Sequence, residues 1–296
     1  MNLYYVGSAL NVSTLYMIAG TGAALSLKTG EYNLGGEGQI YLGGFLSAVI
    51  LNQLCNLPGI IALPFSFLAA FIVSGLLTLL SAFLKQYKNA DFLFTTYIAS
   101  AAVIPFIDGL ISGPFRSKTE NLLATSFISQ NFRLPVLLKP SSFNISVIPA
   151  IGLCIFFFYI LYHTAFGRKL CIFGISNTFA KYAGYNRKKI TYSSAFISGG
   201  LHGLCGAVAI AGTYYTCHLG FYSGMGWNAF SVALIAAANP ILLIPSSLFM
   251  GFVTTFSTKY SLYHNFGFDM SSIIQAVILF IISFPILKKG DTANDI

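Results

Sequence analysis

The chain is poor in charged residues. Asp, Glu, Lys and Arg make up 8% of its 296 residues, whereas a typical soluble domain carries about 25%. This scarcity excludes an ordinary soluble globular domain. The hydrophobic fraction is 56% and the mean hydropathy is +0.75. These values predict a polytopic α-helical membrane protein.

Several motifs that carry chemistry are also missing. The sequence has no G-x-x-x-x-G-K-[ST] loop to cradle ATP and no H-E-x-x-H or G-x-S-x-G motif for hydrolysis. No nucleophile and base stand at a spacing that would suit an intramembrane enzyme. We therefore expect no catalytic residue in this chain and no bound cofactor.

The five cysteines are isolated and form no C-x-x-C pair, so no disulfide framework is expected. His202 and Cys205 are three residues apart, and Cys217 precedes His218. A metal site needs three or four ligands in one shell, and we predict none here. His202 is instead expected to pack in a helix and to bond to a neighbouring carbonyl.

What the chain does contain is a series of continuous apolar runs. Strands of a transmembrane barrel alternate polar and apolar residues, so these runs favour helices. The fold class expected is all-α, with about nine membrane segments (range 8–10). These are placed near residues 8–27, 39–51, 59–84, 92–111, 145–164, 192–213, 228–238, 241–257 and 270–287. Because a span needs ~20 residues, the shortest runs must be broken or re-entrant.

Basic residues set the expected orientation, because Lys and Arg collect in cytoplasmic loops. Residues 85–89 and 165–190 are basic, and Lys288-Lys289 precede the short tail 291–296. We expect all three on the cytoplasmic side, with residues 1–290 forming a single transmembrane domain. The net charge of +8 is attributed to this topology and not to nucleic acid. Alternation places the loop 112–144 outside, although its four basic residues argue against that side.

Residues 30–44 form a glycine-rich polar break between two apolar runs, and they hold Asn33, Glu37 and Gln39. Broken helices often supply such groups to sites inside membrane transporters, so the wall of a path through the membrane is expected here. The alternative is that Asn33 and Glu37 only cap the second span.

Aromatic and polar residues further along the chain are added to the predicted path. Tyr97 belongs to it, and Trp227 and Asn228 could stack on and hydrogen-bond an aromatic base. The alternative for Trp227 is an aromatic belt at the membrane interface. Asp108 is expected to be solvated or to pair with Arg116.

A short helix is predicted inside the basic loop. Ser176 or Asn177 can cap a helix over residues 178–183, and Gly184 can end it in the left-handed conformation. The small residues Ala180 and Ala183 would let this helix sit in a groove of a soluble partner. The alternative is a basic loop that only sets topology.

Four segments, in order, resemble a known family. Gly30-Glu-Tyr-Asn-Leu-Gly-Gly-Glu-Gly-Gln39 is similar to the Gly-x-x-Asn-Ile-Gly-x-Glu-Gly-Gln signature of ABC importer permeases of the branched-chain amino acid, ribose and nucleoside type. Gly174 to Gly184 resembles the coupling segment of that family. Ser198 to Ala207, and Gly226 to Leu234 with Asn239-Pro240, match two further elements. Asn228 departs from the pattern, because the family often has Asp there.

The resemblance, closest to the nucleoside and related riboflavin branch, implies a permease subunit of an ATP-driven importer. Its partners would be two cytoplasmic ATPases that hold ATP and Mg²⁺, a second permease, identical or different, and an external substrate-binding lipoprotein. The implied location is the cytoplasmic membrane, and the implied cargo is a heterocycle carrying ribose or ribityl, with riboflavin included. A ribose-type sugar and an ATP-independent secondary transporter remain alternatives. The coupling residues implied are Gly174, Asn177, Ala180, Lys181, Tyr182, Ala183 and Gly184.

Overall fold

A computed structural model describes residues 3–118, 121–264, 272–274, 276, 277, 280 and 281, and the elements within them are helical. In chain order they are α1 (Leu3–Lys28), α2 (Gly36–Gln53), α3 (Gly59–Lys88), α4 (Phe92–Ser112), the 3-10 turn η1 (Gln130–Phe132), α5 (Val147–His163), α6 (Ala165–Ile175), α7 (Asn177–Tyr182), α8 (Arg187–Ala209), the π-helical turn η2 (Ile210–Tyr214), α9 (Met225–Ile235) and α10 (Leu243–Tyr263).

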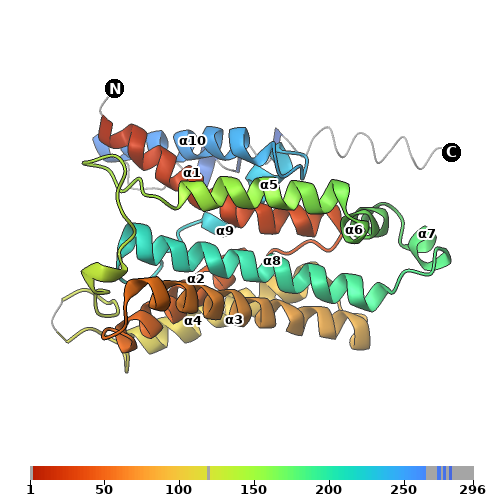
Figure 1. The fold of residues 1–296 in the computed structure, drawn as a ribbon, viewed down its shortest axis with the longest axis horizontal. Coiled ribbons are helices and arrows are strands. Elements are labelled where there is room, and N and C mark those ends of the chain that lie inside the picture. Colours follow the sequence, from red (N-terminus) through yellow and green to blue (C-terminus); the bar gives the residue numbers. More distant parts are fainter. Residues whose placement is uncertain (1–2, 119–120, 265–271, 275, 278–279, 282–296) are drawn as a thin grey trace.

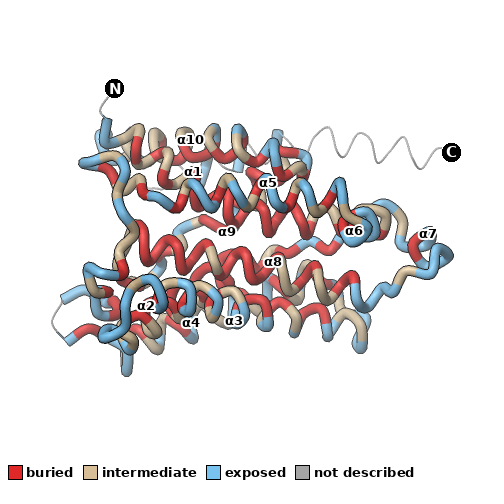
Figure 2. The backbone as a smooth tube through the Cα atoms, viewed as in Figure 1, coloured by how far each residue is buried: buried red, intermediate tan, exposed pale blue. Residues whose placement is uncertain are grey.

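The long helices lie along one axis and the connections gather at its two ends (Figure 1). Residues 113–118 and 121–146 cover one end, where α1 begins. The helices α6 and α7 lie at the other end, beside the start of α8 and the end of α3. We call the first the loop end and the second the α7 end. Helix α1 is the centre of the bundle, packed against α5, α8, α9 and α10 and buried along most of its length (Figure 2).

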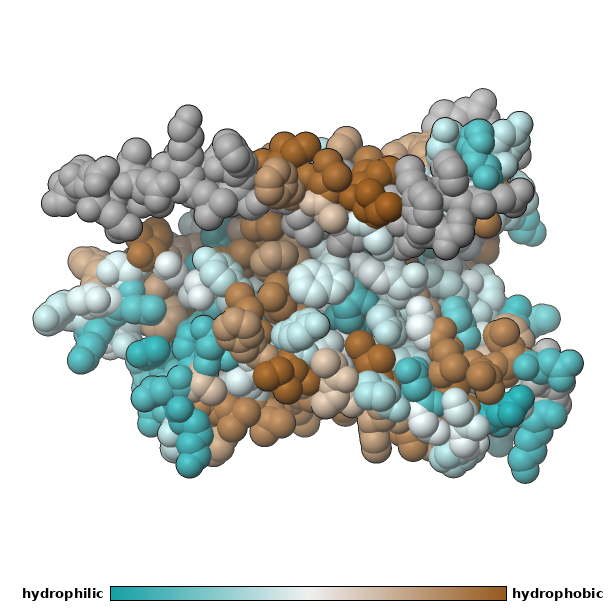
Figure 3. All heavy atoms as spheres, turned by 180° about the vertical axis from the view of Figure 1, so that it is seen from behind, coloured by the Kyte–Doolittle hydropathy of each residue, from teal (hydrophilic) through white to brown (hydrophobic). Residues whose placement is uncertain are grey.

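Within the part of the chain that the structure describes, four helices, α1, α3, α4 and the continuous α8–η2, are long and apolar enough to cross a membrane. The pair α5 and α6, bent by 76°, would make a fifth span. Figure 3 shows hydrophilic residues gathered at both ends of the molecule, with hydrophobic residues between them. The protein is therefore a polytopic all-α membrane protein. The count of about nine segments stays a prediction, and most of the expected span 270–287 lies outside the described residues.

Two helix contacts are made backbone against backbone. A Cβ atom on Gly206 of α8 would overlap the carbonyl oxygen of Ile40 on α2, and one on Gly43 would overlap the backbone of Gly203. Small residues allow such close packing of membrane helices. The pair α2–α8 is therefore held at a distance that only glycine permits.

The basic segment 165–190 is largely helical, which the sequence pattern predicted only at its centre. Helix α6 begins at Ala165 because the Thr164 hydroxyl accepts a hydrogen bond from the Gly167 N–H at 3.1 Å. Helix α8 begins at Arg187, five residues before the predicted span, where Asn186 caps it through the Lys189 N–H. Lys and Arg are good helix formers. A segment rich in them can therefore determine which side of the membrane it lies on and still be helical.

Of the two expectations for Asp108, exposure to solvent and a pair with Arg116, only the pair was wrong, because the residue is partly exposed. Its carboxylate accepts a hydrogen bond from the Tyr41 hydroxyl of α2 at 2.5 Å. Within the described ranges, no ion pair joins Asp108 to Arg116. Helices α2 and α4 pack together, which places Tyr41 of α2 beside Asp108 of α4.

Candidate functional site

The chain breaks inside the bundle between α1 and α2. Residues 29–35 have no helical structure, yet Glu31, Asn33 and Gly35 are buried. Gly30 has φ +68°, a left-handed conformation that glycine adopts without strain. Broken backbone at membrane depth is tolerated only where protein or a wet cavity surrounds it, and here the packed helices enclose the break.

A cluster of neutral polar side chains fills the break. Asn33 Nδ2 donates to Gln39 Oε1 at 2.9 Å and to Ser198 Oγ at 3.0 Å, while Gln39 Nε2 donates back to Asn33 Oδ1 at 3.0 Å. His202 Nδ1 lies 2.8 Å from Gln39 Oε1. The Gly35 N–H donates to Asn33 Oδ1. Asn33 and Gln39 thus hold the turn that leads into α2, although no side chain caps that helix.

An acidic residue ties the same segment to two other helices. Glu31, which is 2% exposed, pairs with Lys85 at the end of α3. Its other oxygen accepts a hydrogen bond from the Thr191 hydroxyl of α8 at 3.2 Å. This contact anchors the segment at the α7 end of the molecule.

Glu37 makes a different connection, to the first turn of α9. Its Oε1 atom accepts hydrogen bonds from the Gly226 and Trp227 N–H groups, at 2.8 and 3.1 Å. The first N–H groups of a helix lack intrahelical partners, so the carboxylate caps α9 from another helix. Glu37 is 8% exposed, and its Oε2 atom has no hydrogen-bond partner among the described residues.

A cavity of about 320 Å³ opens beside this carboxylate. Its lining comes from α2, α4, α9 and the loops that lead into α2 and α9: Leu34, Glu37, Tyr97, Ser100, Ala101, Ile104, Tyr222, Gly224 and Trp227. The rings of Tyr97 and Trp227 lie 6.3 Å apart at its partly exposed edge. Three predicted residues, Glu37, Tyr97 and Trp227, therefore meet in one place. We call this the Glu37 cavity.

Asn228 does not join them. It lines a second cavity of about 640 Å³, between α1, α9 and α10, together with Asn11 and Thr213. Consecutive helix residues point about 100° apart, so Trp227 and Asn228 face different spaces. Asn33 and Gln39 line neither cavity.

Two polar residues of the Glu37 cavity, Ser100 and Tyr222, are among those that were not predicted from the sequence. Ser100 Oγ accepts a hydrogen bond from the Gly38 N–H at 2.7 Å. The signal that could have found it is the pair Thr96 and Ser100, two small polar residues one turn apart on a largely apolar helix. Tyr222 lies in a loop, where nothing in the local pattern indicates a contact with α2.

The predicted short helix is present as α7. The Ser176 hydroxyl accepts a hydrogen bond from the Phe179 N–H at 3.2 Å, and Gly184 has φ +74°. Ala180 is buried, whereas Phe179 and Tyr182 are 59% and 87% exposed. The helix therefore presents large apolar side chains outward at the α7 end.

Gly174, at the end of α6, touches the chain that leads into the break. A Cβ atom on Gly174 would overlap the carbonyl oxygen of Lys28, and Gly30 lies against the Gly174 backbone. Helix α6 thus rests directly on residues 28–30.

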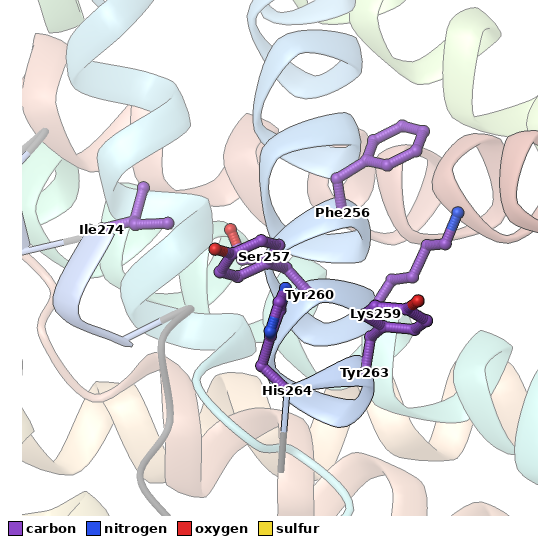
Figure 4. Close-up of a pocket in the computed structure, with 7 residues that line it drawn as sticks. All are labelled: Phe256, Ser257, Lys259, Tyr260, Tyr263, His264 and Ile274. Atoms are coloured by element: carbon purple, nitrogen blue, oxygen red, sulfur yellow. The ribbon is translucent and has the colours of Figure 1, made fainter. Parts of the chain in front are cut away.

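A further groove runs along the end of α10, near the start of α1. Tyr260 and His264 lie side by side in it, 4.3 Å between ring centroids (Figure 4). The Lys259 ammonium lies 4.3 Å from the Tyr5 ring centroid. None of the residues predicted for the path lines this groove.

Apolar membrane-length helices that enclose a broken polar segment and a lined cavity are typical of membrane transport proteins. The comparison with known families gives the same class. The chain belongs to the family of permease components of branched-chain amino acid transport systems, whose model matches residues 5–283.

Three relatives illustrate the range of this family. The chain is 30% identical to the "Probable riboflavin import permease protein" of Treponema pallidum, over 94% of this chain and 74% of the relative. It is 25% identical to a guanosine ABC transporter permease of Bacillus subtilis, over 84% and 72%. It is 25% identical to a glucose ABC transporter permease of Haloferax volcanii, over 92% and 74%.

Proposed function

We propose that this chain is the membrane subunit through which an ATP-driven importer moves a heterocycle carrying ribose or ribityl, with riboflavin included. The observation that carries the proposal is the Glu37 cavity, where two aromatic rings and a buried carboxylate meet beside the break between α1 and α2. Aromatic rings stack on planar heterocycles, and the relatives named for riboflavin and guanosine support this class of cargo.

Energy would come from partner subunits that bind ATP and Mg²⁺ on the cytoplasmic side. The α7 end carries the basic residues Lys28, Lys85, Lys88, Arg168, Lys169, Lys181, Arg187, Lys188 and Lys189. Excess Lys and Arg favours the cytoplasmic face. At the same end lie the residues proposed to couple the permease to these subunits: Gly174, Asn177, Ala180, Lys181, Tyr182, Ala183 and Gly184. A second permease and an external binding lipoprotein complete the proposed importer.

A sugar is the second candidate cargo, because one relative is named for glucose. The two candidate cargoes can be distinguished by measuring uptake into proteoliposomes that contain the assembled importer and trapped ATP. We expect riboflavin or a nucleoside to accumulate and labelled ribose and glucose to stay outside. Accumulation of a sugar without any heterocycle would overturn the proposed cargo.

The proposed orientation predicts which cysteine reacts from outside the cell. Cys55 is exposed at the loop end, just after α2. A membrane-impermeant maleimide is expected to label it in intact cells, and Cys55→Ser to remove that label. In a Cys55→Ser, Cys171→Ser background, Lys181→Cys should be labelled only after permeabilisation. Labelling of Lys181→Cys from outside intact cells would mean that the orientation is the reverse of the one proposed.

A further inference from the structure

Helix α4 carries a single ionisable side chain, the carboxylate of Asp108. Ionisable residues on membrane-spanning helices are rare, and they commonly mark the path of a solute. The Tyr41 hydroxyl donates to Oδ1 at 2.5 Å, whereas no described residue donates to Oδ2 or pairs with the carboxylate as a cation. Asp108 is partly exposed, and Oδ2 is not among the enclosed, unpartnered polar atoms of the described chain. This oxygen can therefore be reached by a solute.

The position of Asp108 on α4 relates it to the Glu37 cavity. Tyr97, Ala101 and Ile104 line that cavity from α4. Residues three or four apart lie on one face of a helix, so Asp108 continues this stripe four residues beyond Ile104. A rise of 1.5 Å per residue places it about 6 Å farther along the helix. The carboxylate thus lies just beyond the cavity, toward the loop end, where α4 ends.

Two tyrosines connect this carboxylate to the cavity wall. Tyr41, the fully buried donor to Asp108, lies one turn beyond Glu37 on α2. Its ring centroid lies 4.9 Å from that of Tyr222, which lines the cavity. Tyr222 also lies within electrostatic range of both Glu37 and Asp108. The cavity and the carboxylate are therefore joined by direct contacts and belong to one site.

This site has an aromatic part and an acidic part. The rings of Tyr97 and Trp227, with centroids 6.3 Å apart, offer faces on which a planar heterocycle can stack. A carboxylate accepts hydrogen bonds from sugar hydroxyl groups, as acidic residues do from ribose in dinucleotide sites, and such charge-assisted bonds are strong. A solute with a flat ring at one end and neutral hydroxyl groups at the other matches both parts.

We propose that Oδ2 of Asp108 accepts hydrogen bonds from the hydroxyl groups of the solute's ribose or ribityl, while the heterocycle lies against Tyr97 and Trp227. This inference rests on the proposed function and deepens it, because it assigns a residue to the hydroxylated half of the solute. The site selects flavins and nucleosides that carry these hydroxyl groups over analogues with the same ring that lack them.

A pair of flavins tests the inference in the unaltered chain. Riboflavin and lumiflavin share one chromophore, but lumiflavin has a methyl group in place of the ribityl chain. Each is titrated into the purified full-length permease, and quenching of its single tryptophan, Trp227, reports binding. Riboflavin should bind about 10- to 100-fold more tightly, the effect of a hydrogen bond to a charged group. Guanosine should likewise displace riboflavin far better than 2′,3′-dideoxyguanosine does.

Asp108→Asn is the matched variant. Its amide oxygen can still accept the Tyr41 hydroxyl, but the charge is lost and an NH₂ group replaces Oδ2. Riboflavin affinity should fall to that of lumiflavin, whose own affinity should not change. Asp91→Asn is the control, because Asp91 caps the opposite end of α4 through the Leu93 N–H and Asn caps equally well. That variant should keep the wild-type ratio of affinities.

The outcomes separate this inference from the function beneath it. Equal affinity for the two flavins in the wild-type chain would overturn the inference, as would flavin uptake without any quenching of Trp227. An unchanged ratio in Asp108→Asn, or an equal loss for both flavins, would also overturn it. None of these results would touch the proposed cargo class. Absence of both quenching and uptake, for flavins and nucleosides alike, would overturn the proposed function itself.

Discussion

Replacing Tyr182 by glutamate is expected to abolish ATP-driven uptake while leaving the permease folded and inserted. The Tyr182 side chain is 87% exposed on α7, so the bundle loses no packing. A large aromatic residue of this kind is typical of the residues that dominate a protein interface. Its loss costs about 2–4 kcal/mol, or roughly 30- to 700-fold in association with the ATP-binding subunits.

The measurement is co-purification of the ATP-binding subunits with the tagged permease, together with uptake into proteoliposomes. Phe127→Glu is the matched control for association, because Phe127 is an exposed aromatic residue at the loop end. It should retain the ATP-binding subunits. If the Tyr182→Glu variant associates normally with the ATP-binding subunits, α7 is not the site at which they bind.

Replacing Gly206 by valine is expected to destabilise the bundle strongly. A Cβ atom at this position overlaps the Ile40 carbonyl, and backbone cannot move aside as a flexible side chain can. We expect a loss of about 3–5 kcal/mol in the free energy of unfolding, seen as lower thermal stability and aggregation in detergent.

Gly152→Val is the control for this second prediction. Gly152 lies in α5 with nothing within 4 Å of an added Cβ, so the same substitution should leave the melting temperature unchanged. Fluorescence-detected size-exclusion chromatography after heating measures both variants. Equal melting curves would mean that α2 and α8 do not pack as closely as described.

Local signals predicted the elements that depend on local chemistry. The cap at Ser176 and the left-handed Gly184 bracket α7 in the sequence as they do in the structure. The glycine-rich stretch likewise marks the start of α2 to within three residues of Gly36. Capping and glycine conformation act over a few residues, which is why a single sequence reveals them.

The pairing of distant segments could not be predicted in this way. Glu37 meets the N–H groups of α9 from 189 and 190 residues away, and no local pattern encodes that contact. The separation of Trp227 from Asn228 depends on where α9 begins and how it is rotated. The predicted run started at residue 228, whereas α9 starts at Met225, so that rotation could not be assigned.

The glycine at position 174 has a mechanical consequence. Because α6 meets residues 28–30 main chain to main chain, a shift of α6 cannot be absorbed by side chains changing rotamer at that contact. Any force applied to α7 therefore passes through α6 and this close main-chain contact to the segment of chain that carries Asn33. A displacement at the α7 end would thus reach the interior of the bundle with almost no slack.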